Sequence, residues 1–280
     1  MTGLLARDRV KFQEVIDLAR ADGGQKFYAL FSGGKDSVTV AHMLDQAGLL
    51  EGCLFVDTTI AIQETIDFVT DYCKEMGWDL EIIQRSDKCK TYDEFVMKYG
   101  FPSSGFHNIT MLELKWKPLR EWVMARKEEG VVLCSGVRSK ESKRRMVNTK
   151  KYQRDKSCKH MRWAAPIHYM STPDVWRYIQ EHGLKRSPVY ENLGMSGDCL
   201  CGAFSSHGEA ELLEIFYPHV ADRIRSLENR CTNARNTWGN GSSMQGVKDQ
   251  TTFNDWACAD CKNHCETTKA WADVLAEAKK

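Results

Sequence analysis

Short apolar runs alternate with longer amphipathic segments over the first two thirds of the chain. Four β-prone runs lie between turn residues, at residues 26–32, 53–59, 80–84 and 131–137. Helix-like segments separate them, at residues 37–48, 65–77 and 118–130. This alternation predicts an α/β fold, with a mostly parallel, twisted sheet flanked by helices.

The first 20 residues are predicted to form an amphipathic helix. Phe12, Val15, Ile16 and Ala19 have the spacing of one helix face. Charges occur throughout this segment, so it does not resemble a signal peptide. No stretch approaches the roughly 20 apolar residues that a membrane span needs. We therefore expect a cytoplasmic protein that does not enter a membrane.

The pattern changes near Ser187, after which strand signals disappear and a long helix is predicted over residues 209–229. We predict a first domain over residues 1–186, built on the sheet, and a small helical, cysteine-rich region over residues 187–280.

The formal net charge is +1. Overall charge therefore predicts neither nucleic acid nor membrane as a partner, and a polyanion would need a local basic patch.

The stretch SGGKDS, residues 32–37, follows the first predicted strand and opens a helix. Its two glycines permit a tight turn and close backbone approach. The amides of residues 34–37 would face an anion at the positive end of the helix dipole. Lys35 adds charge, and Ser32 and Ser37 add hydroxyl donors. The loop thus predicts binding of a nucleotide phosphate, with an ordinary glycine turn as the alternative.

A second candidate anion loop, GVRSKESKRR at residues 136–145, follows the fourth predicted strand. Arginine makes bidentate contacts with phosphate or sulfate. Arg138, Arg144 and Arg145, beside the Ser139 and Ser142 hydroxyls, would form an anion pocket. Because both loops follow strands of one parallel sheet, they would lie at the same sheet edge. A solvated basic loop is the alternative.

Residues 32–37 resemble the pyrophosphate-binding loop of the ATP pyrophosphatase (PP-loop, or adenine nucleotide α-hydrolase) superfamily, whose members split ATP between the α and β phosphates. The segment FVDTTIAIQETIDFV resembles the Asp-Thr-Gly…Glu-Thr segment of its PAPS reductase branch. The matching positions are Asp57, Thr58, Glu64 and Thr65. Thr59 stands where that branch has glycine, which leaves the local turn open.

The loop at residues 136–145 resembles the second anion-binding loop of that branch, Gly-x-Arg-x-x-Glu-Ser-x-x-Arg. The resemblance implies an adenine nucleotide α-hydrolase-like fold that binds ATP, or PAPS or APS, with Mg²⁺. The residues implied to bind the nucleotide are Ser32, Gly33, Gly34, Lys35, Asp36, Ser37, Asp57, Thr58, Gly136, Arg138, Glu141, Ser142, Arg144 and Arg145. Those implied to act in catalysis are Lys35, Asp36, Ser37, Arg138 and Arg145.

Positive charge is dense over residues 140–162, where Tyr152 is the single aromatic residue. Contact with a nucleic-acid backbone, a mobile lid over a polyphosphate and a solvated charged run all fit this composition. A base-stacking platform is weakly supported there, because such platforms need several aromatic rings. We therefore keep a nucleic-acid acceptor at residues 138–162 as one predicted partner.

Eleven cysteines in a chain expected to be cytoplasmic indicate metal or redox chemistry in preference to disulfides. The candidate metal ligands are Cys199, Cys201, Cys258, Cys261 and Cys265. Four thiolates suit either zinc or a [4Fe–4S] cluster. The segment SPVYENLGMSGDCLCGAF resembles iron–sulfur members of the branch and favours a [4Fe–4S] cluster, with Cys265 as the rival ligand. Asp198 stands where those members have their first cysteine.

Three functions follow from these motifs. The first is an ATP-dependent, adenylating sulfurtransferase that forms AMP and pyrophosphate and uses a sulfur donor such as a cysteine desulfurase. It resembles the sulfur-transfer subunit of DNA phosphorothioation systems of the Dnd and Ssp type, and tRNA thiolation is a related reaction. The second is a PAPS or APS reductase, although the tail lacks the Glu-Cys-Gly-Leu-His motif of those enzymes. The third is a non-enzymatic partner subunit that senses nucleotide or carries the cluster.

Overall fold

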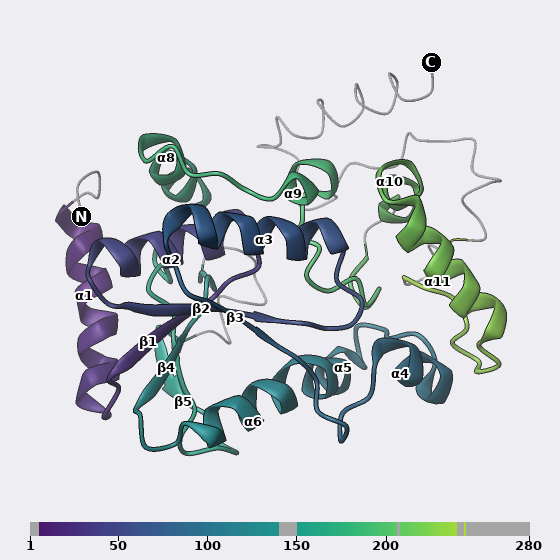
Figure 1. Ribbon diagram of the computed structural model, residues 1–280, viewed down its shortest axis with the longest axis horizontal. Coiled ribbons are helices and arrows are strands. Elements are labelled where there is room, and N and C mark those ends of the chain that lie inside the picture. The colour runs from purple at the N-terminus through teal and green to yellow at the C-terminus, as the bar shows by residue number, and fades with distance from the viewer. Residues whose placement is uncertain (1–5, 140–149, 206–207, 240–243, 245–280) are drawn as a thin grey trace. The chain divides into compact units, whose positions relative to one another are not determined.

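Figure 1 shows the computed structural model of the chain, which describes residues 6–139, 150–205, 208–239 and 244. Within these residues one sheet has the strand order β3-β2-β1-β4-β6-β5. All neighbouring strands run parallel except β5 and β6. The strands are β1 (Lys26–Leu30), β2 (Leu50–Val56), β3 (Leu80–Ile83), β4 (Val131–Cys134), β5 (Tyr152–Arg154) and β6 (Arg162–Ala164).

The chain divides into two compact units. The first consists of Met1–Tyr92 and Ile109–Leu200, and the second of Asp93–Asn108 and Cys201–Lys280. This division differs from the one expected at residue 186. Residues 187–200 belong to the first unit, where Thr58 and Thr65 donate hydrogen bonds to backbone carbonyls of residues 196–198.

Helices cover both faces of the sheet in the first unit. They are α1 (Ala6–Ala21), α2 (Lys35–Gln46), α3 (Gln63–Met76), α6 (Lys117–Ala125), α8 (Thr172–Glu181) and α9 (Pro188–Leu193). Helix α5 (His107–Met111) leads into the π-helical turn η1 (Leu112–Trp116), which α6 continues. Figure 1 shows α2 and α3 over one face of the sheet and α6 over the other.

The alternation of side chains along β1 explains the two layers. Phe27 and Ala29 are buried on the face that packs with α1, α2, α3 and α8. Tyr28 and Leu30 contact the opposite core, which contains side chains of α6. The sheet is therefore buried on both sides, as expected for parallel strands.

The expected α/β fold with a mostly parallel sheet is confirmed. The four predicted strands are present. Three of them have shorter bounds, whereas β2 begins and ends three residues earlier than expected. The predicted N-terminal helix is α1, and Phe12, Val15, Ile16 and Ala19 are each at most 1% exposed. Period-3.6 and short apolar patterns were sufficient to locate these elements.

The β5–β6 hairpin was not predicted, because it lies in the basic run that was interpreted as a lid, a nucleic-acid contact or a solvated segment. Asp22 holds this hairpin at the edge of the sheet. It accepts hydrogen bonds from Tyr152 and, at 2.8 Å, from Nε of Arg154. The Arg154 hydrogen bond is the main reason why the pKa of Asp22 is lowered. Arg162 donates to the Asp22 carbonyl oxygen at 2.8 Å. Two arginines of the basic run, Arg154 and Arg162, therefore stabilise the fold through Asp22.

The second unit contains α4 (Tyr92–Tyr99) apart from its first residue, α10 (Glu209–Phe216) and α11 (Pro218–Arg230). The single helix expected over residues 209–229 is wrong, because the helix breaks at Tyr217, where φ is −138° and ψ is 58°. A proline disfavours the helical conformation of the residue before it, and Pro218 begins α11.

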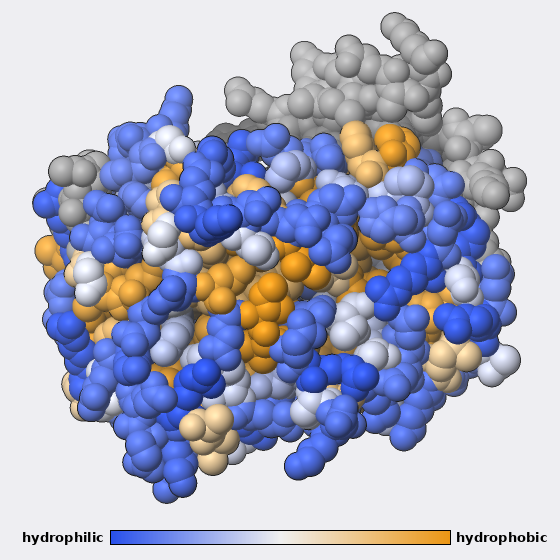
Figure 2. Space-filling model, in the orientation of Figure 1, coloured by the Kyte–Doolittle hydropathy of each residue, from blue (hydrophilic) through white to orange (hydrophobic). Residues whose placement is uncertain are grey.

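Hydrophilic residues cover most of the face shown in Figure 2, and apolar residues gather in a band across its middle. Within the described residues, no helix is long and apolar enough to cross a bilayer.

Candidate functional site

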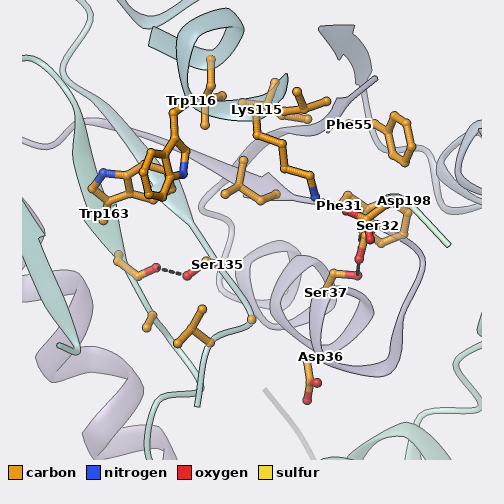
Figure 3. Close-up of a pocket in the computed structure, with 18 of the residues that line it drawn as sticks. Phe31, Ser32, Asp36, Ser37, Phe55, Lys115, Trp116, Ser135, Trp163 and Asp198 are labelled. Atoms are coloured by element: carbon orange, nitrogen blue, oxygen red, sulfur yellow. Dashed lines mark hydrogen bonds and ion pairs between the residues drawn. The ribbon is translucent and has the colours of Figure 1, made fainter. Parts of the chain in front are cut away.

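A cavity of about 690 Å³ opens at the carboxyl ends of β1 and β2 in the first unit. Its polar end contains Ser32, Asp36 and Ser37 of the glycine-rich loop, and Figure 3 shows these side chains on one side of the space. The other end is apolar and includes Trp116 and Trp163. The position agrees with the rule that ligands of parallel sheets bind beyond the strand carboxyl ends.

The backbone of the glycine-rich loop is held in a conformation that suits an anion. Gly33 has a φ of +73°, and a Cβ there would lie 2.9 Å from the Phe68 ring. Gly34 is the N-cap of α2, and no side chain hydrogen bonds to this helix start. The first-turn amides of α2 therefore point towards the polar end without a competing side-chain acceptor.

The two predicted serines fix the loop. Ser37 is 6% exposed, and its hydroxyl donates to the Gly34 carbonyl oxygen at 2.9 Å. The Ser37 hydroxyl oxygen in turn accepts from the Ser32 backbone amide at 3.2 Å. Ser37 therefore closes the loop that its backbone amide helps to form.

Asp36 is held between two cations. Its Oδ2 is 2.6 Å from Nζ of Lys35, and its Oδ1 accepts from Nε of Arg138 at 2.8 Å. Arg138 is 1% exposed and also donates to Oγ1 of Thr172 at 3.2 Å. The guanidinium therefore supports Asp36 from beneath the loop, so the structure gives Arg138 a positioning role. Its predicted direct contact with the ligand stays a prediction.

Gly136 explains how the second loop approaches the first so closely. A Cβ at this position would lie 2.8 Å from Cβ and 2.9 Å from the carbonyl carbon of Asp36. Gly136 itself lines the cavity. A side chain here would therefore collide with the backbone of the phosphate loop.

Asp57 and Thr58, both predicted to bind nucleotide, make internal hydrogen bonds. Asp57 accepts from the Thr59 amide at 2.7 Å. Thr59 has a φ of 60°, so its backbone is in the left-handed region that glycine adopts most easily. The PAPS reductase branch has glycine at this position. Thr58 donates to the carbonyl oxygen of Asp198 at 2.8 Å, and Thr65 donates to that of Ser196 at 2.7 Å.

Residues 196–198 consequently form a wall of the cavity. Asp198 makes an ion pair with Lys115, and both side chains line the space between the loop and the tryptophans. Burial raises the pKa of Asp198, but Lys115 and a hydrogen bond from Ser196 outweigh burial and leave the pKa below its usual value. The carboxylate is therefore charged.

Sequence reasoning missed Lys115, Trp116 and Trp163. Lys115 and Trp116 lie in η1, and Trp163 lies in β6, a strand that was not predicted. A helix-period pattern indicated α6 but not the π turn before it. The long-range pairing of Lys115 with Asp198 has no local signal.

Several predicted residues fall outside the described part of the chain. They are Glu141, Ser142, Arg144, Arg145, Cys258, Cys261 and Cys265. Cys199 is half-buried and Cys201 is buried, and neither forms a disulfide within the described residues. Among the described residues there is no group of three or more His, Cys, Asp or Glu side chains that could hold a metal ion. Of the five candidate ligands, the described residues supply two thiols, so a four-thiolate centre would need two of the three tail cysteines.

The model of the phosphoadenosine phosphosulfate reductase domain matches residues 26–211. The chain belongs to this family. The match covers the sheet, the glycine-rich loop and residues 196–198, and it confirms the expected PAPS reductase branch. The members of this family are enzymes, among them the reductase named below.

Two relatives illustrate the range of the family. An adenosine 5′-phosphosulfate reductase of Bacillus cereus is 27% identical over 169 residues, which cover 60% of this chain and 68% of that protein. An uncharacterised protein of Methanocaldococcus jannaschii is 28% identical over 170 residues, which cover 59% of this chain but only 39% of that protein. Neither name refers to DNA phosphorothioation, so that narrower resemblance stays a prediction.

Solved structures show more distant similarity. The phosphoadenylyl-sulfate reductase of Candida auris has a TM-score of 0.47 and 20% identity, covering 64% of this chain and 83% of that chain. The U34-tRNA thiolase NcsA of Methanococcus maripaludis, with its [4Fe-4S] cluster, has a TM-score of 0.45 and 17% identity, covering 94% and 88%.

Proposed function

We propose that this member of the PAPS reductase domain family binds ATP in the cavity, adenylates an acceptor oxygen and thereby prepares the acceptor for sulfur transfer. The observation that carries the proposal is the intact SGGKDS loop at the start of α2, where no side chain caps the helix and Ser32, Asp36 and Ser37 line the cavity. Such a helix start binds the phosphates of a nucleotide.

The steps assign defined roles to residues of the chain. The acceptor oxygen attacks the α-phosphorus, the bond to the bridging oxygen breaks, and pyrophosphate leaves. The amides of α2 and the Lys35 ammonium offset the charge that develops on the phosphates. Mg²⁺, when bound, would neutralise phosphate oxygens, with the Asp36 carboxylate as a candidate ligand. A sulfur nucleophile then attacks the activated centre and AMP leaves.

The proposal includes a [4Fe–4S] cluster, held by Cys199 and Cys201 together with Cys258 and Cys261, or with Cys265 in place of one of them. Cys199 directly follows Asp198 of the cavity wall, which supports a cluster near the nucleotide. A sulfide-binding cluster would supply sulfur or electrons to the reaction. A cysteine desulfurase as donor and a nucleic acid as acceptor at residues 138–162 belong to the same proposal.

Reduction of adenosine 5′-phosphosulfate is the second candidate, because Bacillus relatives carry that name. In that reaction a thiolate attacks the sulfur atom, AMP leaves, and a second thiol releases sulfite. The phosphate loop would then bind the single phosphate of an adenylate. The two candidates differ in whether ATP itself is cleaved.

The test uses the full chain, purified without oxygen, with ATP labelled at the α and γ phosphates and Mg²⁺. We expect AMP and pyrophosphate, and at least a tenfold lower rate in Ser37→Ala, because the loop loses hydrogen bonds worth about 1.5 kcal/mol or more. Ser226→Ala removes a matched hydroxyl from the exposed side of α11 and serves as the control.

Sulfite release from adenosine 5′-phosphosulfate with a thiol reductant, without ATP cleavage, would replace the first candidate by the second. Iron and labile sulfide are measured on the same sample. Four iron atoms per chain that fall to background in Cys199→Ala would support the cluster, whereas stoichiometric zinc would contradict it.

A further inference from the structure

We propose that Trp116 and Trp163 form the subsite for the nucleobase of the bound nucleotide, and that the π turn η1 exists to present Trp116 there. This inference rests on the proposed binding of nucleotide at the SGGKDS loop. It assigns the recognition of the nucleobase to two side chains that lie outside every motif of the sequence.

The cavity suits a ligand with two chemically different ends. Its polar end contains residues of the phosphate loop. Its apolar end includes the two indoles, and the lining also contains Leu30, Leu54 and Leu119, with the polar side chains of Gln153 and Asp155 next to Trp163. A polyphosphate alone would leave the apolar end filled with water. A nucleotide satisfies both ends, because it joins a phosphate chain to a planar, largely apolar ring.

The π turn explains how Trp116 reaches this wall. Met111, Lys115, Trp116 and Leu119 all line the cavity. On a regular α-helix, residues 111, 115 and 119 share a face, whereas residue 116 points about 100° away from residue 115. The Lys117 amide donates to the Leu112 carbonyl oxygen, an i to i+5 bond, so one extra residue enters the turn. Trp116 is thereby brought to the face of Met111.

π turns are rare and occur frequently at functional sites, because their looser geometry must be offset by another gain. Here the turn places a cation and an indole on one wall. Lys115 lies nearer the phosphate loop, where it pairs with Asp198, and Trp116 lies towards the apolar end. Lys115 and Trp116, adjacent in one turn, would thus contact the phosphates and the base of one nucleotide.

Trp163 is already oriented before a ligand binds. Its Nε1 donates to Oδ2 of Asp155 at 3.4 Å. Asp155 is in turn fixed by the Ser157 and Cys158 amides at 2.8 and 3.0 Å. An indole held in this way loses little freedom when a base stacks on it. Trp116 is 38% exposed, so it has surface left for a ring to cover.

The experiment compares two ligands that share a phosphate chain but differ in the base. Binding of Mg-ATP and of Mg-tripolyphosphate is measured by calorimetry on the full chain and on Trp116→Ala, Trp163→Phe and Trp116→Phe. We expect Trp116→Ala to bind ATP about tenfold more weakly, as loss of a base–aromatic stack does. Tripolyphosphate affinity should not change, and Trp116→Phe should recover part of the loss.

Tyr99→Ala provides the matched control, since Tyr99 is an exposed aromatic residue on α4 that does not line the cavity. Unchanged ATP affinity in Trp116→Ala, or an equal loss for both ligands, would overturn the inference. It would also be overturned if the variant lost affinity only for a single-stranded oligonucleotide, which would make the indole a contact for an acceptor base.

Two results separate this inference from the proposed function. If wild-type protein binds ATP and tripolyphosphate equally well, the base is not recognised and the subsite is wrong, while phosphate binding stands. If wild-type protein binds neither ligand, the phosphate loop does not hold a nucleotide, and both proposals fail together.

Discussion

The two ends of the cavity are built in different ways. The polar end is formed by backbone, held by close contacts between Gly136 and Asp36 and by the buried Arg138 guanidinium. The apolar end is formed by side chains, among them Trp116 of η1 and Trp163 of β6, and Trp116 is 38% exposed. Changes at the polar end should therefore cost stability and binding together, whereas changes at the apolar end should cost binding alone.

Gly136→Ala should have the largest effect. The new Cβ would meet the Asp36 backbone at 2.9 Å, where nothing flexible can move aside. We expect overpacking to lower the free energy of unfolding by about 1–3 kcal/mol and nucleotide binding to be lost. Urea unfolding and calorimetry measure the two quantities. Gly105→Ala, where a Cβ meets nothing within 4 Å, is the matched control.

Arg138→Met tests whether the buried guanidinium supports the polar end from beneath. Removing it leaves Asp36 with one of its two cations, so the free energy of unfolding should fall by about 3 kcal/mol. A double-mutant cycle with Asp36→Asn should show coupling between the two residues. If stability is unchanged but nucleotide affinity falls, Arg138 contacts the ligand directly and the positioning role is wrong.

His42 anchors the middle of α2 and makes the polar end sensitive to acid. Its Nδ1 lies 2.8 Å from the Tyr178 hydroxyl oxygen on α8. Burial, with His182 nearby, lowers the pKa of His42 from 6.5 to about 4. The unfolded chain therefore takes up a proton near pH 6.5 while the folded chain stays neutral. This contribution to stability is lost as the pH falls from about 6.5 towards 4.

Between pH 7 and pH 5 the loss should amount to about 2 kcal/mol. Urea unfolding of wild type and His42→Gln at both pH values measures it, since subtraction removes the groups that the two proteins share. Equal pH slopes in the two proteins would show that His42 titrates normally and does not stabilise the polar end through its neutral form.

Trp116→Ala should have the smallest effect on folding. The side chain is exposed, so we expect the free energy of unfolding to change by about 0.5 kcal/mol or less. The measurement is the urea midpoint at constant slope. If the free energy of unfolding fell by more than about 2 kcal/mol, the indole would be part of the core. The apolar end would then contribute to stability as the polar end does.

The polar end could be predicted from the sequence because it depends on local geometry. SGGKDS marks a strand end, a turn and a helix start within a few residues. Glycine in such a position indicates a tight turn or a positive φ. Thr59 is instructive, since the left-handed backbone is kept although glycine is absent. The α/β fold was predictable for the same reason, as its strands are short apolar runs between turns.

The rest depends on contacts between residues far apart in sequence. Arg138 was predicted as an anion ligand, but its partner Asp36 is 102 residues away, and pairing at that range leaves no local signal. Trp116 needs a π turn that no hydrophobic period reveals. The β5–β6 hairpin was missed because each strand has three residues and its charges are satisfied by Asp22.

The wall formed by residues 196–198 bears on how the protein reaches its native state. Its hydrogen-bonded partners include Thr58, Thr65 and Lys115, which precede it by 140, 131 and 83 positions in the chain. Contacts of such long range form late, because the intervening loops must close first. During synthesis, the sheet and the phosphate loop can assemble before this stretch leaves the ribosome. A nascent chain therefore passes through an interval in which the cavity stands open on one side, and a chain terminated before Ser196 would remain in that state.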